Sequence, residues 1–174
     1  MKRLITATIL CVFLPHQAFS QSALNQLESD LNAVPVGHNA ATKRYELISN
    51  AISSFNSLTR GCGDKKQYRE LFELAPAING AATMQHIGEV NALALIKCPE
   101  VYLSTLLETN EKEISASVGV MGITLPPWET AEAIYPYLEK PKFKMLMDKY
   151  FKEWVVSCTN EEGKAKIGCN FSSN

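Results

Sequence analysis

The chain of 174 residues has few of the residues and motifs from which active sites are commonly built. It contains three histidines, and only His38 and His86 lie after residue 20. It has no G-x-S-x-G nucleophile motif and no glycine-rich phosphate loop. No two cysteines have C-x-x-C spacing, and no cysteine beyond residue 20 has a histidine close to it in the sequence, which argues against a zinc site. We therefore expect no catalytic residues, no cofactor and no bound metal.

The chain also lacks an apolar run long enough to cross a membrane. The longest run, residues 4–14, falls short of the roughly 20 residues that a spanning helix needs. It follows Lys2 and Arg3, is ended by Pro15, and precedes the small residues Ala18 and Ser20. This order of features is that of a secretory signal peptide. We expect residues 1–20 to be a signal peptide cleaved after Ser20, and we expect no stable membrane insertion of the mature chain.

An excess of positive charge is missing as well. Once Lys2 and Arg3 are removed with the signal peptide, 15 basic residues face 18 acidic ones, a net charge of −3. This balance argues against general nucleic-acid binding. The remaining residues, about 154, are enough for one ordinary domain with its own core. We expect a single domain over residues 21–158, followed by a polar tail over residues 159–174 that is tethered by a disulfide.

Four cysteines are present beyond the signal peptide: Cys62, Cys98, Cys158 and Cys169. An even number of cysteines in an exported chain indicates disulfides, and therefore the periplasm or the cell exterior. Residues 64–73 and 82–97 have helical spacing and are joined by a turn. In an antiparallel helix pair the entrance of the first helix lies beside the exit of the second. This geometry predicts the disulfide Cys62–Cys98, which leaves Cys158 to pair with Cys169.

Apolar residues recur at the three- and four-residue spacing of helices through the whole domain, and no segment favours a strand. Asp64 with Gln67, and Asn110 with Glu113, have the spacing of capping boxes at two helix starts. The expected fold class is therefore all-α. We expect seven to eight helices, near residues 22–33, 39–61, 64–73, 82–97, 99–107, 110–125, 128–138 and 143–156.

A shift of 31 residues places Leu106-Leu107-Glu108 on Tyr137-Leu138-Glu139. The segments that contain them, residues 99–124 and 127–156, each consist of a helix, a short polar turn and a second helix. This pattern is similar to that of HEAT-type repeats over about a third of the chain. Residues such as Asn110 and Ser115 stand where such repeats usually carry an Asp and an Arg. The resemblance implies stacked antiparallel helical hairpins, arranged as an α-solenoid or an irregular bundle.

His86 and Glu89 are the best candidates for chemistry. They lie three residues apart and share one face of an expected helix. They could form a general-base pair or half of a metal site, but the chain offers no second pair of ligands. A surface pair, or an interior pair with its hydrogen bonds satisfied, is the commoner arrangement. A small helical hydrolase that uses His86 and Glu89 is therefore an alternative hypothesis.

Two surface features favour an interaction role. Glu108, Glu111 and Glu113 crowd one turn between two expected helices, and we call these residues the acidic tip. Trp128 follows two prolines at a helix start, and exposed aromatic residues are frequent anchors of interfaces. We expect the protein to bind another protein through these four residues.

The expected function follows from export, a helical fold and the lack of a catalytic set. Small exported helical proteins of this kind often act as inhibitors or immunity proteins, an analogy at the level of the fold. We expect a non-enzymatic, periplasmic immunity or inhibitor protein that neutralises an envelope-targeting toxin or hydrolase. An accessory subunit of an envelope secretion or pilus assembly is the alternative within the binding class.

Overall fold

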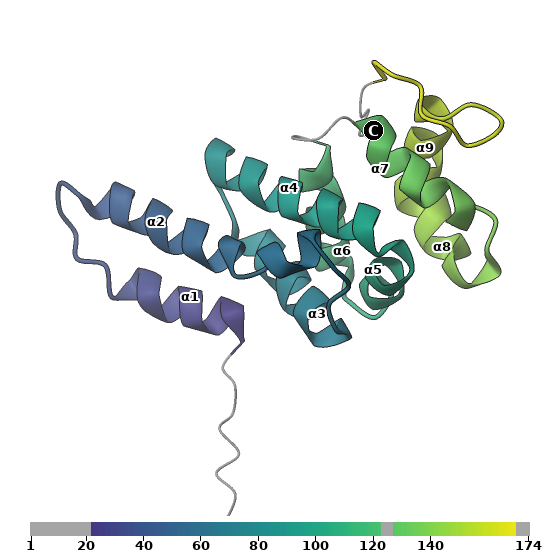
Figure 1. The fold of residues 1–174 in the computed structure, drawn as a ribbon. Coiled ribbons are helices and arrows are strands. Elements are labelled where there is room, and N and C mark those ends of the chain that lie inside the picture. Colours follow the sequence, from purple (N-terminus) through teal and green to yellow (C-terminus); the bar gives the residue numbers. More distant parts are fainter. Residues whose placement is uncertain (1–21, 123–126, 170–174) are drawn as a thin grey trace, which may run out of the picture.

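The computed structural model describes residues 22–122 and 127–169, and this part of the chain is all-helical (Figure 1). Its only extended pairing is an isolated bridge between Thr159 and Ala165. Eight helices are present there if the last three successive segments are counted as one, which confirms the all-α expectation. The elements are α1 (Ala23–Asn32), α2 (Ala40–Ser53), η1 (Asn56–Thr59), α3 (Lys65–Leu74), η2 (Ala75–Ala77), α4 (Ala81–Lys97), α5 (Pro99–Leu106), α6 (Glu111–Met121), α7 (Pro127–Ile134), η3 (Tyr135–Tyr137), η4 (Pro141–Phe143), α8 (Lys144–Leu146), η5 (Met147–Phe151) and α9 (Lys152–Cys158).

Side-chain caps fix the starts of three helices. Ser22 accepts a hydrogen bond from a backbone N–H in the first turn of α1. Both expected capping boxes are confirmed: Asp64 with Gln67 opens α3, and Asn110 with Glu113 opens α6. In each box the cap side chain accepts a hydrogen bond from a backbone N–H that has no partner within the helix. The side chain three residues later accepts one from the backbone N–H of the cap residue. The sequence therefore determines these starts locally.

The second helix is shorter than the sequence indicates. The expectation of one helix over residues 39–61 is wrong, because α2 ends at Ser53 and a 3₁₀ turn follows. The hydroxyl of Ser54 donates to the carbonyl oxygen of Ala51 at 2.7 Å, a bond that competes with continuing the helix. Asn39 precedes α2 but makes no side-chain capping bond.

The last helix is also irregular. The expected helix over residues 143–156 is interrupted by η5, a π-helical turn that carries an extra residue. Met147 and Phe151 at the ends of this turn are buried, while Lys149 between them reaches Glu111 of α6. The expected helix near residues 128–138 is divided too, because α7 ends at Ile134 and a separate 3₁₀ turn that contains Pro136 follows.

The first six helices lie in two rows. Helices α1, α3 and α5 are successive neighbours in one row, and α2, α4 and α6 are successive neighbours in the other (Figure 1). The starts of α2 and α4 lie together, so these two helices run in the same direction. Of the two hairpins expected from the HEAT-type pattern, α7 does pack against α9, whereas α5 packs mainly on α3 and α4. The solenoid arrangement itself stays a prediction.

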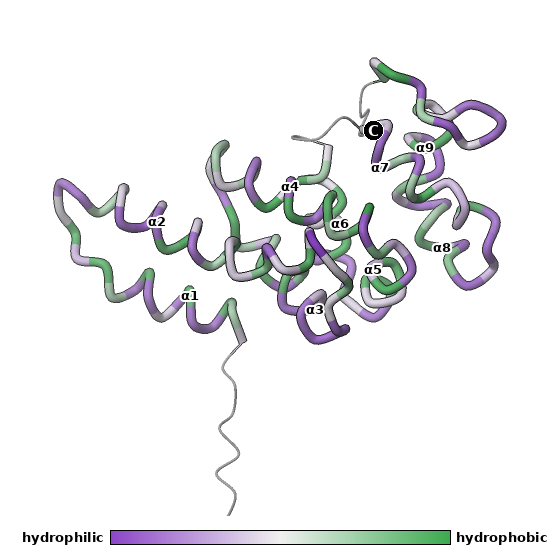
Figure 2. Tube along the Cα trace, viewed as in Figure 1, coloured by the Kyte–Doolittle hydropathy of each residue, from purple (hydrophilic) through white to green (hydrophobic). Residues whose placement is uncertain are grey.

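Helix α4 is the centre of the core. It contacts α2, η1, α5, α6 and α7, and it is buried over more than one stripe. Apolar and polar positions alternate more evenly along α1 and α2, at the edge of the molecule (Figure 2). In the core, the ring of Tyr102 packs edge to face with the rings of Tyr68 and Phe72. The hydroxyl of Tyr102 donates to the amide oxygen of Asn91 at 2.7 Å in the same buried region.

Both predicted disulfides are present. Cys62 and Cys98 have Cα atoms 5.5 Å apart, and those of Cys158 and Cys169 are 5.4 Å apart. These separations lie in the usual range for disulfides. The first bridge joins the loop before α3 to the junction of α4 and α5, and the second closes the C-terminal tail.

The tail is held by more than its disulfide. The hydroxyl of Tyr135 donates to the carbonyl oxygen of Glu161 at 2.8 Å. The side-chain oxygen of Asn160 accepts hydrogen bonds from two backbone N–H groups within the tail. The Tyr135 ring also occupies the place where a Cβ atom on Gly163 would lie, and Gly163 has φ +76. A glycine is therefore required there, and the tail is an ordered loop with specific contacts to the helices.

Candidate functional site

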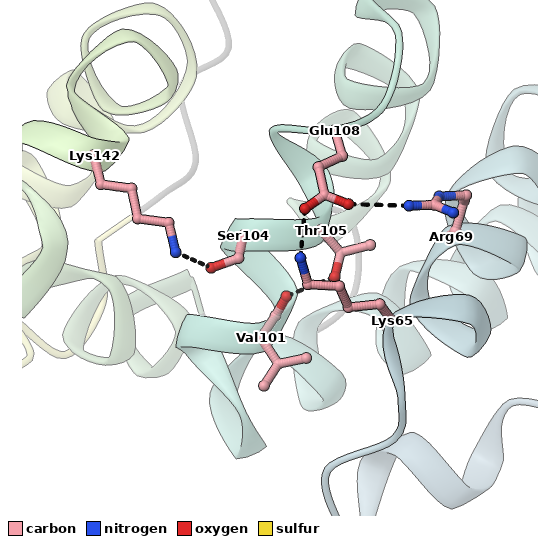
Figure 3. Close-up of polar contacts among 7 residues, drawn as sticks. All are labelled: Lys65, Arg69, Val101, Ser104, Thr105, Glu108 and Lys142. Carbon is pink, nitrogen blue, oxygen red and sulfur yellow. Dashed lines mark hydrogen bonds and ion pairs between the residues drawn. The ribbon is translucent and has the colours of Figure 1, made fainter.

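The acidic tip lies between α5 and α6, and its first carboxylate is paired within the chain. Glu108 forms ion pairs with Lys65 and Arg69, both on α3 (Figure 3). The distance from the Arg69 Nη2 atom to the Glu108 Oε2 atom is 3.0 Å. The hydrogen bond from Lys65 is the main reason why the pKa of Glu108 is lowered. This carboxylate therefore ties α3 to the end of α5.

The other two carboxylates of the tip are engaged as well. Glu111 pairs with Lys149 of η5, and this hydrogen bond lowers the pKa of Glu111. Glu113 is half-buried and forms the capping box with Asn110. The tip thus joins three parts of the fold, and cations of the same chain offset much of its charge. Its role in partner binding stays a prediction.

A second polar link lies close to the tip. The Lys142 Nζ atom donates to the Ser104 Oγ atom at 2.8 Å, which connects η4 to α5 (Figure 3). Lys140 lies over the ring of Tyr137 at 4.0 Å from its centroid, and Lys144 pairs with Asp148 at 2.8 Å. The basic side chains of this turn are therefore also engaged inside the chain.

Trp128 lies in the first turn of α7. It is half-buried and packs against the hydrophobic core, so only part of the indole is available to a partner. Its use as an interface anchor stays a prediction.

His86 has a neighbour that the sequence did not indicate. The Ser49 Oγ atom on α2 lies 3.5 Å from the His86 Nδ1 atom on α4, and both residues are half-buried. Glu89 is exposed, and within residues 22–122 and 127–169 it has no hydrogen bond or ion pair with His86. The structure therefore brings together Ser49 and His86 and leaves the expected pair unjoined. The two residues are 37 positions apart, so no sequence motif links them. They meet only because α2 and α4 pack side by side in the same direction.

A groove of 310 Å³ lies between the first half of α2 and the start of α4, and we call it the α2–α4 groove. Its lining residues include Arg44, Tyr45 and Ile48 from α2, together with Gly80, Ala82 and Thr83. Arg44 is exposed, and Tyr45 retains 49% exposure, which is high for a large aromatic residue. Arg44 is the one charged side chain among the lining residues.

The α2–α4 groove leads toward the contact between Ser49 and His86. Ser49 follows Ile48 directly and lies one helical turn after Tyr45. His86 lies one turn after Ala82. The groove and the serine–histidine contact are thus successive parts of one seam between two parallel helices. Sequence reasoning missed this seam, because neither Arg44 nor Tyr45 belongs to a motif.

The described residues contain neither a metal-binding cluster nor a membrane-spanning helix. No group of three or more His, Cys, Asp or Glu side chains there could hold a metal ion. Over the same residues, none of the helices combines the length and the apolar character that crossing a bilayer requires.

Comparison with known proteins identified no similar protein. No protein-family model, curated protein or solved structure matches the chain.

Proposed function

We propose that this chain is an exported domain that binds another protein through the end of the molecule formed by α1 and α2. The observation that carries the proposal is that two adjacent residues, half-exposed Tyr45 and exposed Arg44, both line the α2–α4 groove. Tyrosine and arginine, with tryptophan, are enriched in the energetic centres of protein interfaces. Val36 is fully exposed in the turn between α1 and α2, ahead of the helix that carries Arg44 and Tyr45.

Two disulfides support export, because such bridges form and persist outside the reducing cytosol. The predicted signal peptide over residues 1–20 lies outside the described residues. We place the protein in the periplasm or outside the cell.

The specific role we propose is that of an immunity or inhibitor protein. In this role the α1–α2 end covers the active site of an envelope-targeting toxin or hydrolase. An accessory subunit of an envelope assembly would use the same surface for a different partner, and the identity of the partner separates the two roles.

The contact between Ser49 and His86 is the one observation that favours the hydrolase alternative. A serine beside a histidine is the first half of a nucleophile and base arrangement. The second half is a group that orients the histidine, and the described residues show no acidic side chain bonded to His86. The seam therefore supports binding better than catalysis.

Photocrosslinking in the native host tests the proposed function. A benzophenone amino acid is placed at one of three exposed positions: Tyr45 in the groove, Glu111 in the acidic tip, or Val156 on α9. Captured proteins are identified by mass spectrometry, and the purified partner is then assayed with and without the purified domain.

The outcomes separate the candidate roles. Stoichiometric inhibition of a captured hydrolase or toxin supports the inhibitor role. Capture of an assembly component without inhibition supports the accessory role. Failure to capture any protein from all three positions would refute protein binding as the function.

A further inference from the structure

We infer that the α2–α4 groove accepts an acidic segment of the partner protein that carries one apolar anchor residue. This inference rests on the proposed function and specifies the chemistry of the partner.

The charge of the groove is the first argument. The chain as a whole is slightly acidic, with a net charge of −1. Lys43 and Arg44 are neighbours near the start of α2, and the nearest acidic residues in the sequence, Asp30 and Glu46, do not line the groove. Since the only charged side chain that lines the groove is Arg44, an acidic ligand complements this site and a basic one does not.

The state of Arg44 is the second argument. Many cations in the described part of the chain are already paired with carboxylates, among them Lys65, Arg69, Lys144 and Lys149. Arg44 is exposed and has no ion pair or hydrogen bond among the described residues. Its planar guanidinium is therefore available for a two-point contact with a carboxylate.

The size and lining of the groove are the third argument. A volume of 310 Å³ is at the small end of ligand pockets, which run from roughly 300 to 1,000 Å³. It has room for an apolar side chain together with neighbouring atoms of the ligand, bounded by the ring of Tyr45 and by Ile48, Ala41 and Ala82. Arg44 lines the same groove as these apolar residues. The preferred ligand therefore has an apolar residue with an Asp or Glu next to it in sequence.

Two synthetic nine-residue peptides are the probes. One has a central Leu flanked by Asp and Glu, and the other has the same Leu flanked by Lys. Each peptide is titrated to millimolar concentration into isotopically labelled protein, and the signals of Arg44 and Tyr45 are followed by NMR. We expect the acidic peptide to shift these signals and the basic peptide to leave them unchanged.

Charge-reversal variants give the matched control. R44E removes the groove cation, whereas R60E changes the net charge equally at an exposed site beyond η1, near the opposite end of the α2–α4 pair. We expect R44E to weaken the acidic peptide about tenfold or more, the scale of one charge-assisted contact. R60E should leave the affinity unchanged, and circular dichroism confirms that both variants are folded.

Three results would overturn the inference: no shift of Arg44 or Tyr45 by the acidic peptide, equal binding of the two peptides, or equal weakening by R44E and R60E. The photocrosslinking experiment keeps this failure apart from failure of the proposed function. A partner captured from Tyr45, together with an acidic peptide that leaves Arg44 and Tyr45 unshifted, keeps the proposed binding surface and removes the acidic segment as its ligand. Capture from Glu111 or Val156 alone overturns both the α1–α2 surface and the groove as the binding site.

Discussion

The two disulfides should contribute unequally to stability, and the inequality can be worked out from the chain they enclose. Cys62 and Cys98 are separated by 36 residues, whereas Cys158 and Cys169 are separated by 11. A cross-link stabilises mainly by restricting the unfolded chain, and the effect grows with the logarithm of loop length. The loop-entropy relation gives about 4 kcal/mol for the longer loop and about 3 kcal/mol for the shorter one.

The position of the shorter loop widens this difference. The segment closed by Cys158–Cys169 follows the last described helix, and it can open locally while the helices stay folded. The first bridge joins the segment before α3 to the end of α4 at the centre of the core, so its loss affects global unfolding directly. Each bridge has one buried cysteine, Cys98 in the first and Cys158 in the second, so differences in packing are not expected to reverse the order.

The variants C62A/C98A and C158A/C169A serve as controls for each other. Unfolding in urea, followed by far-ultraviolet circular dichroism, gives the free energy of unfolding of each variant and of the parent protein. We expect the first pair of substitutions to cost at least about 1 kcal/mol more than the second. If C158A/C169A proves as destabilising as C62A/C98A, then the tail belongs to the cooperative core, and loop length does not decide the ranking.

Three further predictions concern single side chains. Replacing Tyr102 with Phe leaves the amide oxygen of Asn91 buried without its donor, which should cost about 1–3 kcal/mol in urea unfolding; a cost near zero would show that the hydrogen bond contributes nothing. Replacing Lys65 with Met should raise the pKa of Glu108 toward its ordinary value in an NMR titration. Because the folded pKa is lowered, the pairing stabilises the fold above the ordinary glutamate pKa and is lost as pH falls through the lowered value; an unchanged pKa would contradict the pairing. Replacing His86 with Ala should leave the biological activity within a few-fold of the parent, whereas a loss of about 100-fold with unchanged folding would favour the hydrolase alternative.

Local physical chemistry is strong enough to fix much of this fold from the sequence. A capping box needs only residues three positions apart, so the starts of α3 and α6 could be predicted from Asp64 and Asn110. The pairing of Cys62 with Cys98 followed from helix lengths and direction alone. Where side chains compete with the helix for backbone bonds, as Ser54 does after α2, the prediction failed, because such competition is decided by a balance of about 1 kcal/mol.

The candidate site could not be predicted in the same way. The sequence identified Glu108 and Glu111 as part of a charged turn. The cations that pair with Glu108 are 39 and 43 residues away, and the one that pairs with Glu111 is 38 residues away. No local pattern encodes such pairs, since they depend on which helices become neighbours.

The sequence by itself determined the helical class, the two bridges and most helix starts, because periodicity, capping and loop closure act over short stretches of chain. The tertiary structure alone decided that α2 and α4 run in the same direction. This packing placed Ser49 beside His86 and opened the groove next to Arg44 and Tyr45. It was decided by the burial of α4 among its neighbours, a global free-energy term that no single segment carries.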